Sequence, residues 1–294
     1  MACTSPKRAW RTELGEVIFA QRGKLITQEF ELPCRNCISC RLDRSRMWSV
    51  RCMHEAQMHD ENCFITLTYA PEHYQPSLHY RHFQLFMKRL RKHVGRPIRF
   101  YMCGEYGDQN GRPHFHACLF GWTPPDQVLF KALPSGSSLF TSATLEGLWP
   151  FGFASVGELT LESAAYVARY VMKKVTGPGA DSHYWSLNPN TGELVQIEPE
   201  FNKMSLKPGI GRPFYDRYKS DIYPDGTCVV NGFKMKPPSY YEHVYKNEDP
   251  FAYEALSFKR QKLVNKNEQT KQRREAKHRV TKARLSFKKR GMTE

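Results

Sequence analysis

The sequence predicts an α+β domain with an antiparallel, ferredoxin-like or RRM-like sheet, helices on one face of that sheet, and a basic C-terminal tail. The first observation is the order of the segments, which alternate between strand and helix patterns with short connections. The second is the distribution of charge. Residues 259–294 contain 14 Lys and Arg and 3 Glu, so +11 of the formal charge of +15 lies in these 36 residues.

The predicted strands are rich in β-branched and aromatic residues, and the predicted helices have apolar residues three and four positions apart. Ser77 is in position to cap the first helix of the domain, whose apolar positions run to Val94, and Thr160 is in position to cap the last. In chain order we predict a strand at 64–69, a helix at 77–94, strands at 98–105 and 112–120, a short helix at 142–148, a strand at 153–159 and a helix at 161–174.

The chain divides by composition into four segments. They are an N-terminal segment with a cysteine cluster (1–60), the domain core (61–177), an extension rich in Pro, Gly, Tyr and Asn that we expect to be irregular (178–258), and the basic tail (259–294). The tail would form a solvated basic helix or stay disordered until it meets a polyanion. It would serve solubility or contact phosphates. We favour phosphate contacts, and assign them to Lys288, Lys289 and Arg290, because a block of like charge repels itself unless a partner neutralises it.

The overall composition excludes several classes of protein. A pI near 9.4 points to an acidic partner, most often nucleic acid. No run approaches the roughly 18 apolar residues of a membrane span, and the N-terminus lacks the apolar stretch of a signal peptide. Nine cysteines without a secretory signal indicate reduced thiols and a metal site rather than a disulfide framework. We therefore expect a soluble intracellular protein.

The segment "YGDQNGRPHFHACLFGW" places two histidines at alternate positions of a predicted strand. Asn110-Gly111 is a strong hairpin-turn signal, and a two-residue turn there puts Glu105 opposite His116. Glu105, His114 and His116 then share one face of the sheet, because opposed residues point the same way. A loop two residues longer would keep this arrangement, whereas a slip of one residue would break it.

Two imidazoles and a carboxylate at this spacing can bind a divalent cation and leave coordination positions free. The alternative is that both histidines are ordinary half-buried residues that make hydrogen bonds. We favour the metal site because three residues of ligand type meet on what we predict to be the face of the sheet away from the core.

The segment "LTLESAAYVARYVMKK" predicts a helix with Tyr166 and Tyr170 one turn apart, about 6 Å along the axis. They share their side of the helix with Arg169, Lys173 and Lys174. Tyrosines in such places commonly cover the edge of a core and keep the hydroxyl in water. Two phenols beside cations, in a chain with a predicted metal site, also suggest nucleophiles. We assign Lys173 and Lys174 to stabilising the phenolate and Arg169 to DNA.

A separate cluster, "CRNCISC", carries Cys34, Cys37 and Cys40. Three thiolates at this spacing can bind zinc, with Cys52, His54 or Cys63 as candidates for the fourth ligand. The alternative is three unligated thiols at the start of a helix.

Three motifs in order resemble those of the HUH endonucleases. "RPHFHACLFG" carries the His-hydrophobe-His motif, "FITLTY" resembles their first motif, and "YVARYVMKK" resembles their third in its two-tyrosine form. Over roughly residues 33–215 the chain resembles replication initiators of small single-stranded-DNA bacteriophages, the gokushovirus branch of the Microviridae.

This resemblance implies an HUH endonuclease that initiates rolling-circle replication in the cytoplasm of a bacterial host. His114, His116 and Glu105 would hold Mg²⁺ or Mn²⁺, and Tyr166 or Tyr170 would cut a single-stranded origin, leaving a 5′-phosphotyrosine and a 3′-hydroxyl. The host helicase and polymerase would be its partners. The relaxase branch has a third histidine shortly after the pair, which is missing here, so Glu105 must complete the site. The alternatives are a nucleic-acid-binding protein with a structural metal and no catalysis, and a single-tyrosine HUH transposase.

Overall fold

The computed structural model describes residues 3–21, 23–107, 111–133, 136–169, 174–175, 179–188, 191–223, 225–263 and 266–287. The chain forms two compact units: residues 1–44 with 257–294, and residues 45–256. We call them the terminal unit and the central unit. Helices α1 (Ile38–Ala56) and α8 (Pro250–Lys262) each have residues in both units. The division into four segments by composition stays a prediction.

The central unit is built on a seven-stranded sheet in which every pair of neighbouring strands is antiparallel. This confirms the mixed helix and sheet class and the large antiparallel sheet predicted from the sequence. In their order across the sheet the strands are β12 (Phe201–Met204), β5 (Arg99–Tyr106), β6 (Pro113–Phe120), β4 (Asn62–Tyr69), β9 (Gly152–Gly157), β8 (Ser138–Thr141) and β7 (Val128–Ala132).

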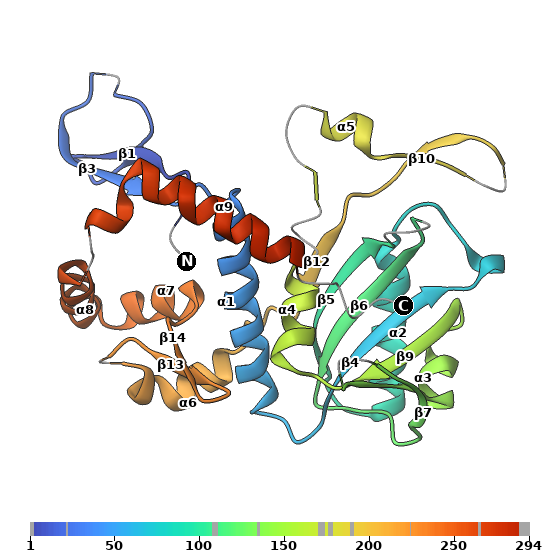
Figure 1. The fold of residues 1–294 in the computed structure, drawn as a ribbon. Coiled ribbons are helices and arrows are strands. Elements are labelled where there is room, and N and C mark those ends of the chain that lie inside the picture. Colours follow the sequence, from blue (N-terminus) through green and yellow to red (C-terminus); the bar gives the residue numbers. More distant parts are fainter. Residues whose placement is uncertain are drawn as a thin grey trace. The chain divides into compact units, whose positions relative to one another are not determined.

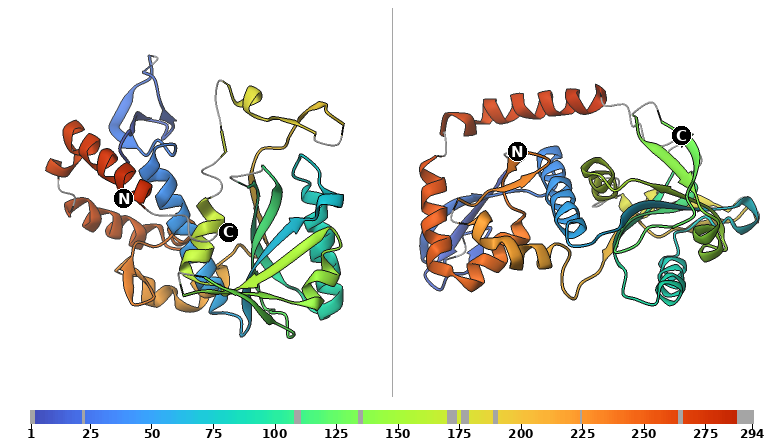
Figure 2. Two further views of the ribbon diagram at one scale, coloured as in Figure 1. Left: turned by 45° about the vertical axis from the view of Figure 1, so that its right-hand side comes forward. Right: turned by 90° about the horizontal axis from the view of Figure 1, so that it is seen from below.

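One face of this sheet packs against α2 (Tyr80–Val94) and α3 (Ala143–Leu148). The core there joins alternate residues of β4 and β6, such as Leu67 and Phe115, to the apolar stripe of α2 that the sequence predicted. Ser142 caps α3 by accepting a hydrogen bond from the Leu145 amide. The right-hand view of Figure 2 shows α2 on one side of the sheet.

The other face of the sheet is covered as well, so the prediction of helices on one face only is wrong. In the central unit Trp48 of α1 stacks on Tyr101 of β5, with ring centroids 4.6 Å apart. Tyr166 of α4 (Leu161–Arg169) packs on β6. Figure 1 shows α4 and α2 on different sides of the sheet. Every residue of β6 is buried as a result, and the histidine face is not the open face that we predicted.

Several boundaries differ from the prediction. The helix predicted from Ser77 begins at Tyr80 with His79 as its cap, and Ser77 instead accepts a hydrogen bond from the amide of Glu198. Strands β7 and β8 form in a stretch that we expected to be a loop. The described part of the last predicted helix ends at Arg169.

The extension at 178–258 is far from irregular. Its strand β12 pairs with β5 at the end of the main sheet, since its Phe201 lies opposite Gly104. The other elements of this stretch are α5 (Ala180–His183), β10 (Trp185–Leu187), β11 (Leu194–Gln196), α6 (Arg212–Ile222), β13 (Cys228–Val230), β14 (Phe233–Met235) and α7 (Ser239–Glu248). Around Tyr215 and Tyr241 these elements form a second apolar core with Val50 of α1.

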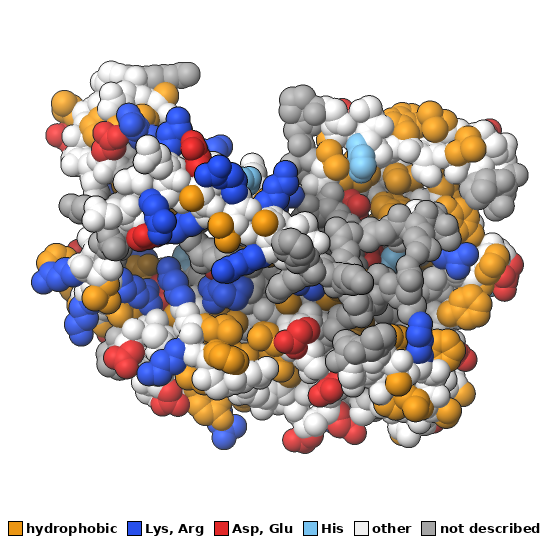
Figure 3. All heavy atoms as spheres, viewed as in Figure 1, with side chains coloured by type: hydrophobic (Ala, Val, Ile, Leu, Met, Phe, Trp, Pro, Cys, Tyr) orange, Lys and Arg blue, Asp and Glu red, His pale blue; other side chains and the backbone are white. Residues whose placement is uncertain are grey.

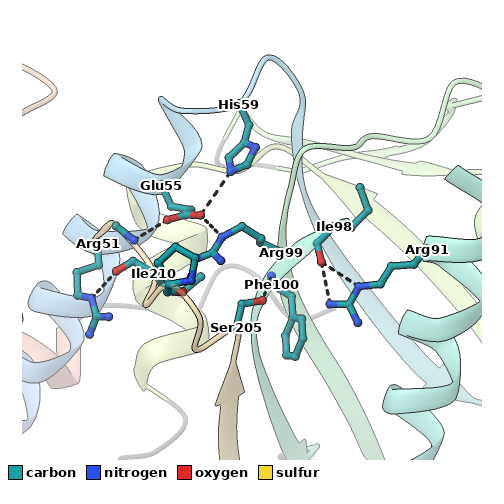
Figure 4. A network of polar contacts seen from close by, with 11 residues as sticks. Arg51, Glu55, His59, Arg91, Ile98, Arg99, Phe100, Ser205 and Ile210 are labelled. Carbon is teal, nitrogen blue, oxygen red and sulfur yellow. Dashed lines mark hydrogen bonds and ion pairs between the residues drawn. The ribbon is translucent and has the colours of Figure 1, made fainter. Parts of the chain in front are cut away.

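Glu55 of α1 is a buried carboxylate that joins three parts of the central unit (Figure 4). Its Oε1 accepts a hydrogen bond from Arg99 of β5, and its Oε2 accepts one from the Gly211 amide at 2.6 Å. His59 lies 3.4 Å from Oε1. Burial alone would raise the pKa of Glu55, but these hydrogen bonds and the charge of Arg99 hold it below its ordinary value.

In the terminal unit, strands β2 (Val17–Ile18), β1 (Lys7–Thr12) and β3 (Ile26–Leu32) form an antiparallel sheet. The basic tail contains a short 3₁₀ helix, η3 (Lys266–Gln269), and the helix α9 (Lys271–Phe287). An ion pair between Arg274 and Glu31 joins α9 to β3, with 2.5 Å between the charged atoms.

Candidate metal centre and nucleophile

The hairpin of β5 and β6 sets the geometry of the predicted metal ligands. Glu105 lies opposite His114, and His116 lies opposite Cys103. The predicted pairing of Glu105 with His116 is therefore wrong by two residues, because Gly107 pairs with Arg112 and the loop is longer than a two-residue turn. Residues 108–110 of that loop lie outside the described residues. An even shift keeps the side chains on one face, so the three ligand-type residues still converge.

All three side chains meet at one oxygen atom. The Nε2 atoms of His114 and His116 lie 2.6 Å and 3.0 Å from Oε1 of Glu105. The three residues are buried, and Glu105 is only 1% exposed. One carboxylate and two imidazoles thus present their ligand atoms within the space that a single cation occupies.

The second ring nitrogen of each histidine has its own partner. His114 Nδ1 lies 3.0 Å from the Arg112 carbonyl, and His116 Nδ1 lies 2.9 Å from the hydroxyl of Thr66. A carbonyl only accepts, so His114 must carry its proton on Nδ1. When His114 is neutral, its Nε2 then turns a lone pair toward the carboxylate of Glu105. That contact is favourable only with a positive charge at this point, either a proton or a metal ion.

The charge state of Glu105 fits such a cation. Burial opposes ionisation of this carboxyl, yet hydrogen bonds and charge from His114 and His116 hold its pKa below the ordinary value. The carboxylate is therefore available as an anionic ligand at neutral pH.

Helix α4 places Tyr166 against this cluster. Thr160 caps the helix, as predicted: its hydroxyl accepts from the Ser163 amide at 3.1 Å, and the Ser163 hydroxyl accepts from the Thr160 amide. One turn further on, the Tyr166 ring contacts the His116 ring edge to face, with centroids 5.0 Å apart. It also contacts the Phe64 ring edge to face. Tyr166 is only 6% exposed, whereas we had placed it beside the packing stripe with the charged residues of the helix.

Two polar contacts that sequence reasoning missed hold α4 on either side of Tyr166. Ser45 of α1 donates to the Ala165 carbonyl at 3.0 Å. Asn202 of β12 donates to the Val167 carbonyl at 3.1 Å. Neither residue carries a local motif, and each is distant in sequence from α4, so only the fold brings them together.

The other predicted site residues are placed less closely or lie beyond the description. Arg169 ends α4, and Lys174 follows it with a half-buried side chain. The remaining predicted residues lie outside the described residues: Tyr170, Lys173, Lys288, Lys289 and Arg290.

The cysteines of the terminal unit form a second group of ligand type. Cys34, Cys37 and Cys40 lie together, and the fourth sulfur beside them is that of Cys3. None of the three candidates that we named for this place belongs to the group. Cys52 is buried in α1, and His54 hydrogen-bonds the Tyr241 hydroxyl. Cys63 of β4 contacts the Trp122 carbonyl.

Along α9, seven Lys and Arg residues stand against one Glu. Figure 3 shows basic side chains gathered over this helix. Arg279, Lys282 and Arg284 are basic residues of its sequence that follow one another at short intervals. A helix of this composition offers an extended positive surface to a polyanion. Among the described residues, no helix is both long and apolar enough to cross a bilayer.

Comparison with known proteins gives consistent relatives. A family model described as replication-associated protein ORF2 matches residues 62–175, which contain both β6 and α4. The chain is 34% identical over 263 residues to the replication-associated protein VP4 of Bdellovibrio phage phiMH2K, covering 85% of this chain and 79% of that protein. It is 33% identical over 273 residues to the replication-associated protein ORF2 of Spiroplasma virus 4, covering 86% and 80%.

A third relative is the replication-associated protein ORF4 of Chlamydia phage 1, which is 33% identical over 227 residues, covering 74% of this chain and 54% of that protein. No solved structure matches the chain.

Proposed function

Because the chain belongs to the replication-associated proteins of small phages of the Microviridae, gokushovirus-like type, we propose that it starts rolling-circle replication as an HUH endonuclease. It would nick a single-stranded origin with a tyrosine nucleophile in a metal-dependent reaction. The observation that carries this proposal is the contact of Tyr166 with His116, which puts a phenol against a cluster of two imidazoles and a carboxylate.

His114, His116 and Glu105 are the residues that would hold Mg²⁺ or Mn²⁺. The donor set of two nitrogens and one oxygen suits a divalent cation, and three ligands leave coordination positions for the phosphate and water. When bound, the ion would polarise a phosphate oxygen and orient the backbone for in-line attack. The partners of the two Nδ1 atoms, Arg112 and Thr66, fix how the imidazoles are turned.

In the proposed reaction the Tyr166 oxygen attacks the scissile phosphorus. The new bond is a 5′-phosphotyrosine, and the bond that breaks is the one between phosphorus and the 3′ oxygen. The phenol loses its proton and the 3′ oxygen gains one, so the products are a covalent protein–DNA link and a free 3′-hydroxyl. Because the phosphodiester is exchanged and not hydrolysed, the reverse attack by a 3′-hydroxyl religates the strand without ATP.

Tyr170 would serve a second cut while the first tyrosine still holds DNA, and Lys173 or Lys174 would stabilise a phenolate. The 3′-hydroxyl would prime the host polymerase after the host helicase opens the duplex, in the cytoplasm of the bacterial host. Arg169, the basic residues of α9 and the terminal Lys288, Lys289 and Arg290 would contact DNA phosphates. These assignments follow the motif order and the charge distribution.

The two alternatives predict different products. A nucleic-acid-binding protein with a structural metal would bind the origin and leave it intact. A single-tyrosine transposase would cut at transposon ends and would not need Tyr170.

A cleavage assay tests the proposal directly. Full-length protein is incubated with a labelled origin strand and Mn²⁺, and the products are separated in denaturing gels. We expect a shortened strand with a free 3′-hydroxyl and a second species that protease treatment shifts, both absent when EDTA is added. Binding without cleavage at any metal concentration would contradict the proposal.

A further inference from the structure

The sulfur atoms of Cys3, Cys34, Cys37 and Cys40 all lie within 4.8 Å of one another, in the terminal unit. Nothing in the proposed nicking reaction uses them. We propose that these four thiolates bind one zinc ion in a closed structural site, separate from the cluster around Glu105.

The β1–β3 pair explains why a residue near the N-terminus joins the CxxCxxC motif. Lys7 of β1 lies opposite Leu32 of β3, so the residues before β1 and after β3 meet at the same end of the pair. Cys3 precedes Lys7 by four positions and Cys34 follows Leu32 by two. Cys37 and Cys40 come at the start of α1, directly afterwards. Three elements of the terminal unit thus contribute sulfur at one point.

The size of the group fits a single zinc ion. Zinc–sulfur bonds of about 2.3 Å in a tetrahedron place neighbouring sulfurs about 3.8 Å apart. The Cys3 sulfur lies 3.5 Å from that of Cys34 and 3.8 Å from that of Cys37. A disulfide would require about 2.05 Å. A four-iron cluster, which also uses CxxCxxC spacing, would spread its cysteines around a cube of iron and sulfur, wider than the group found here.

Backbone contacts hold the sulfurs as zinc sites require. The Cys37 amide lies 3.3 Å from the Cys34 sulfur, and the Cys34 amide lies 3.3 Å from the Cys3 sulfur. Amide donors of this kind stabilise negative charge on a thiolate. The turn that directs them passes through Arg35, with φ of 64°. A non-glycine residue adopts this left-handed conformation only where its surroundings hold it there.

The site would replace an apolar core. Among the described residues of the terminal unit, Ala9 is the one fully buried apolar side chain. Small units that cannot bury enough apolar surface are commonly stabilised by a structural metal. Four protein ligands complete the coordination of zinc and leave no position for water, so this ion would hold β1, β3 and the start of α1 together and take no part in catalysis.

Metal analysis with a pair of alanine variants tests the assignment. Full-length protein purified without chelator should contain one zinc per chain with thiolate ligands, and cobalt in its place should give the intense sulfur-to-cobalt charge-transfer bands of a tetrathiolate. Cys3→Ala should weaken these bands and lose zinc to a chelator at least tenfold faster. Cys52→Ala, a buried cysteine outside the group, should behave like the unaltered chain. Iron in place of zinc, or loss of the bands in Cys52→Ala with retention in Cys3→Ala, would overturn the proposal.

Thiol alkylation of the unaltered chain gives the same answer without a substitution that could prevent folding. With zinc bound, Cys3 should resist alkylation together with Cys34, Cys37 and Cys40, and all four should react once a strong chelator is added. Peptide mass mapping identifies the modified residues. Equal alkylation of Cys3 before and after chelation would exclude it as a ligand. These readouts do not depend on DNA cleavage, so they stand or fall separately from the proposed function.

Discussion

The Tyr166 ring meets the His116 ring at an interplanar angle of 85°, although the two residues are fifty positions apart in the chain. His116 in turn contacts the carboxylate oxygen of Glu105 that also contacts His114. A phenol from α4 and three residues of ligand type from one hairpin therefore form a continuous group. This arrangement is what a metal-assisted tyrosine nucleophile requires, and it makes both parts testable by substitution.

Replacing either histidine by alanine should abolish cleavage and spare binding. A divalent cation supplies several kcal/mol to such a reaction, so His114→Ala and His116→Ala should each lower the cleavage rate by about 1,000-fold or more. Affinity for the origin strand should change little, because phosphate contacts elsewhere dominate it. Single-turnover cleavage and fluorescence anisotropy measure the two quantities.

The matched control for this pair is His183→Ala, since His183 is exposed in α5. It should cleave at the normal rate. Because both site histidines are buried in β6, each variant must also show cooperative unfolding. Normal cleavage by folded His116→Ala would rule out the cluster as the metal centre.

The Thr66 hydroxyl should tune metal affinity through His116. Thr66→Val keeps the shape and removes the bond to Nδ1, and loss of such a supporting contact typically costs 10- to 100-fold in metal affinity. We expect the Mn²⁺ concentration for half-maximal cleavage to rise by about this factor, with the rate at saturation nearly restored. Thr68→Val is the control, because among the described contacts Thr68 bonds neither histidine. An unchanged metal dependence in Thr66→Val would mean that this contact has no role in the site.

The parts of this site that follow from local sequence could be predicted. The alternation of His114 and His116 places both on one face whatever the exact register, provided that the shift is even. Thr160 caps α4 because its hydroxyl needs only the amide three residues later. Strands and helices with a clear period were found within a few residues of their observed ends.

Long-range contacts explain what the sequence did not reveal. Cys3 reaches Cys34 across 31 residues through the β1–β3 pairing, and no spacing rule contains that pairing. The second helical layer was missed because the polar residues of β6 suggested an open face, whereas α1 and α4 cover it. Strand β12 lies in a segment rich in Pro and Gly whose pattern is too short to mark a strand.

The buried carboxylate of Glu55 should make stability depend on pH. Removing one partner from such a buried pair costs about 3–5 kcal/mol, and Glu55→Gln, which keeps the shape, should destabilise the central unit by about 1–3 kcal/mol at pH 7. The folded pKa is below the unfolded one, so the carboxylate stabilises above the unfolded value of about 4.3, and this contribution disappears as pH falls through the folded value. Urea denaturation at several pH values should show the difference between the two proteins shrinking in acid.

The control is Glu61→Gln, which alters an exposed pair with Arg96 and should change stability by less than about 1 kcal/mol. A difference for Glu55→Gln that stays constant down to the lowest pH at which the protein folds would contradict the role assigned to its charge.

The cations of α9 should set the salt dependence of DNA binding. Each phosphate contact contributes about −0.7 to the slope of log affinity against log salt for a single strand. Replacing Arg279, Lys282 and Arg284 by alanine should therefore flatten the slope by about 2, while cleavage of a short oligonucleotide at high concentration survives. The variant Arg279→Lys with Arg284→Lys keeps the charge and should keep the slope. An unaltered slope in the alanine variant would assign α9 to something other than DNA.

Identification of the covalently linked residue tests the central claim most directly. The protein is allowed to cleave an origin oligonucleotide, digested with protease and nuclease, and mapped by mass spectrometry for a tyrosine carrying nucleotide phosphate. The account predicts the adduct on Tyr166, or on Tyr170 for the second cut, and none in Tyr166→Phe with Tyr170→Phe, where the rings and their packing remain. A cleaved strand without attached protein, or an adduct on Tyr69 or Tyr106, would contradict it.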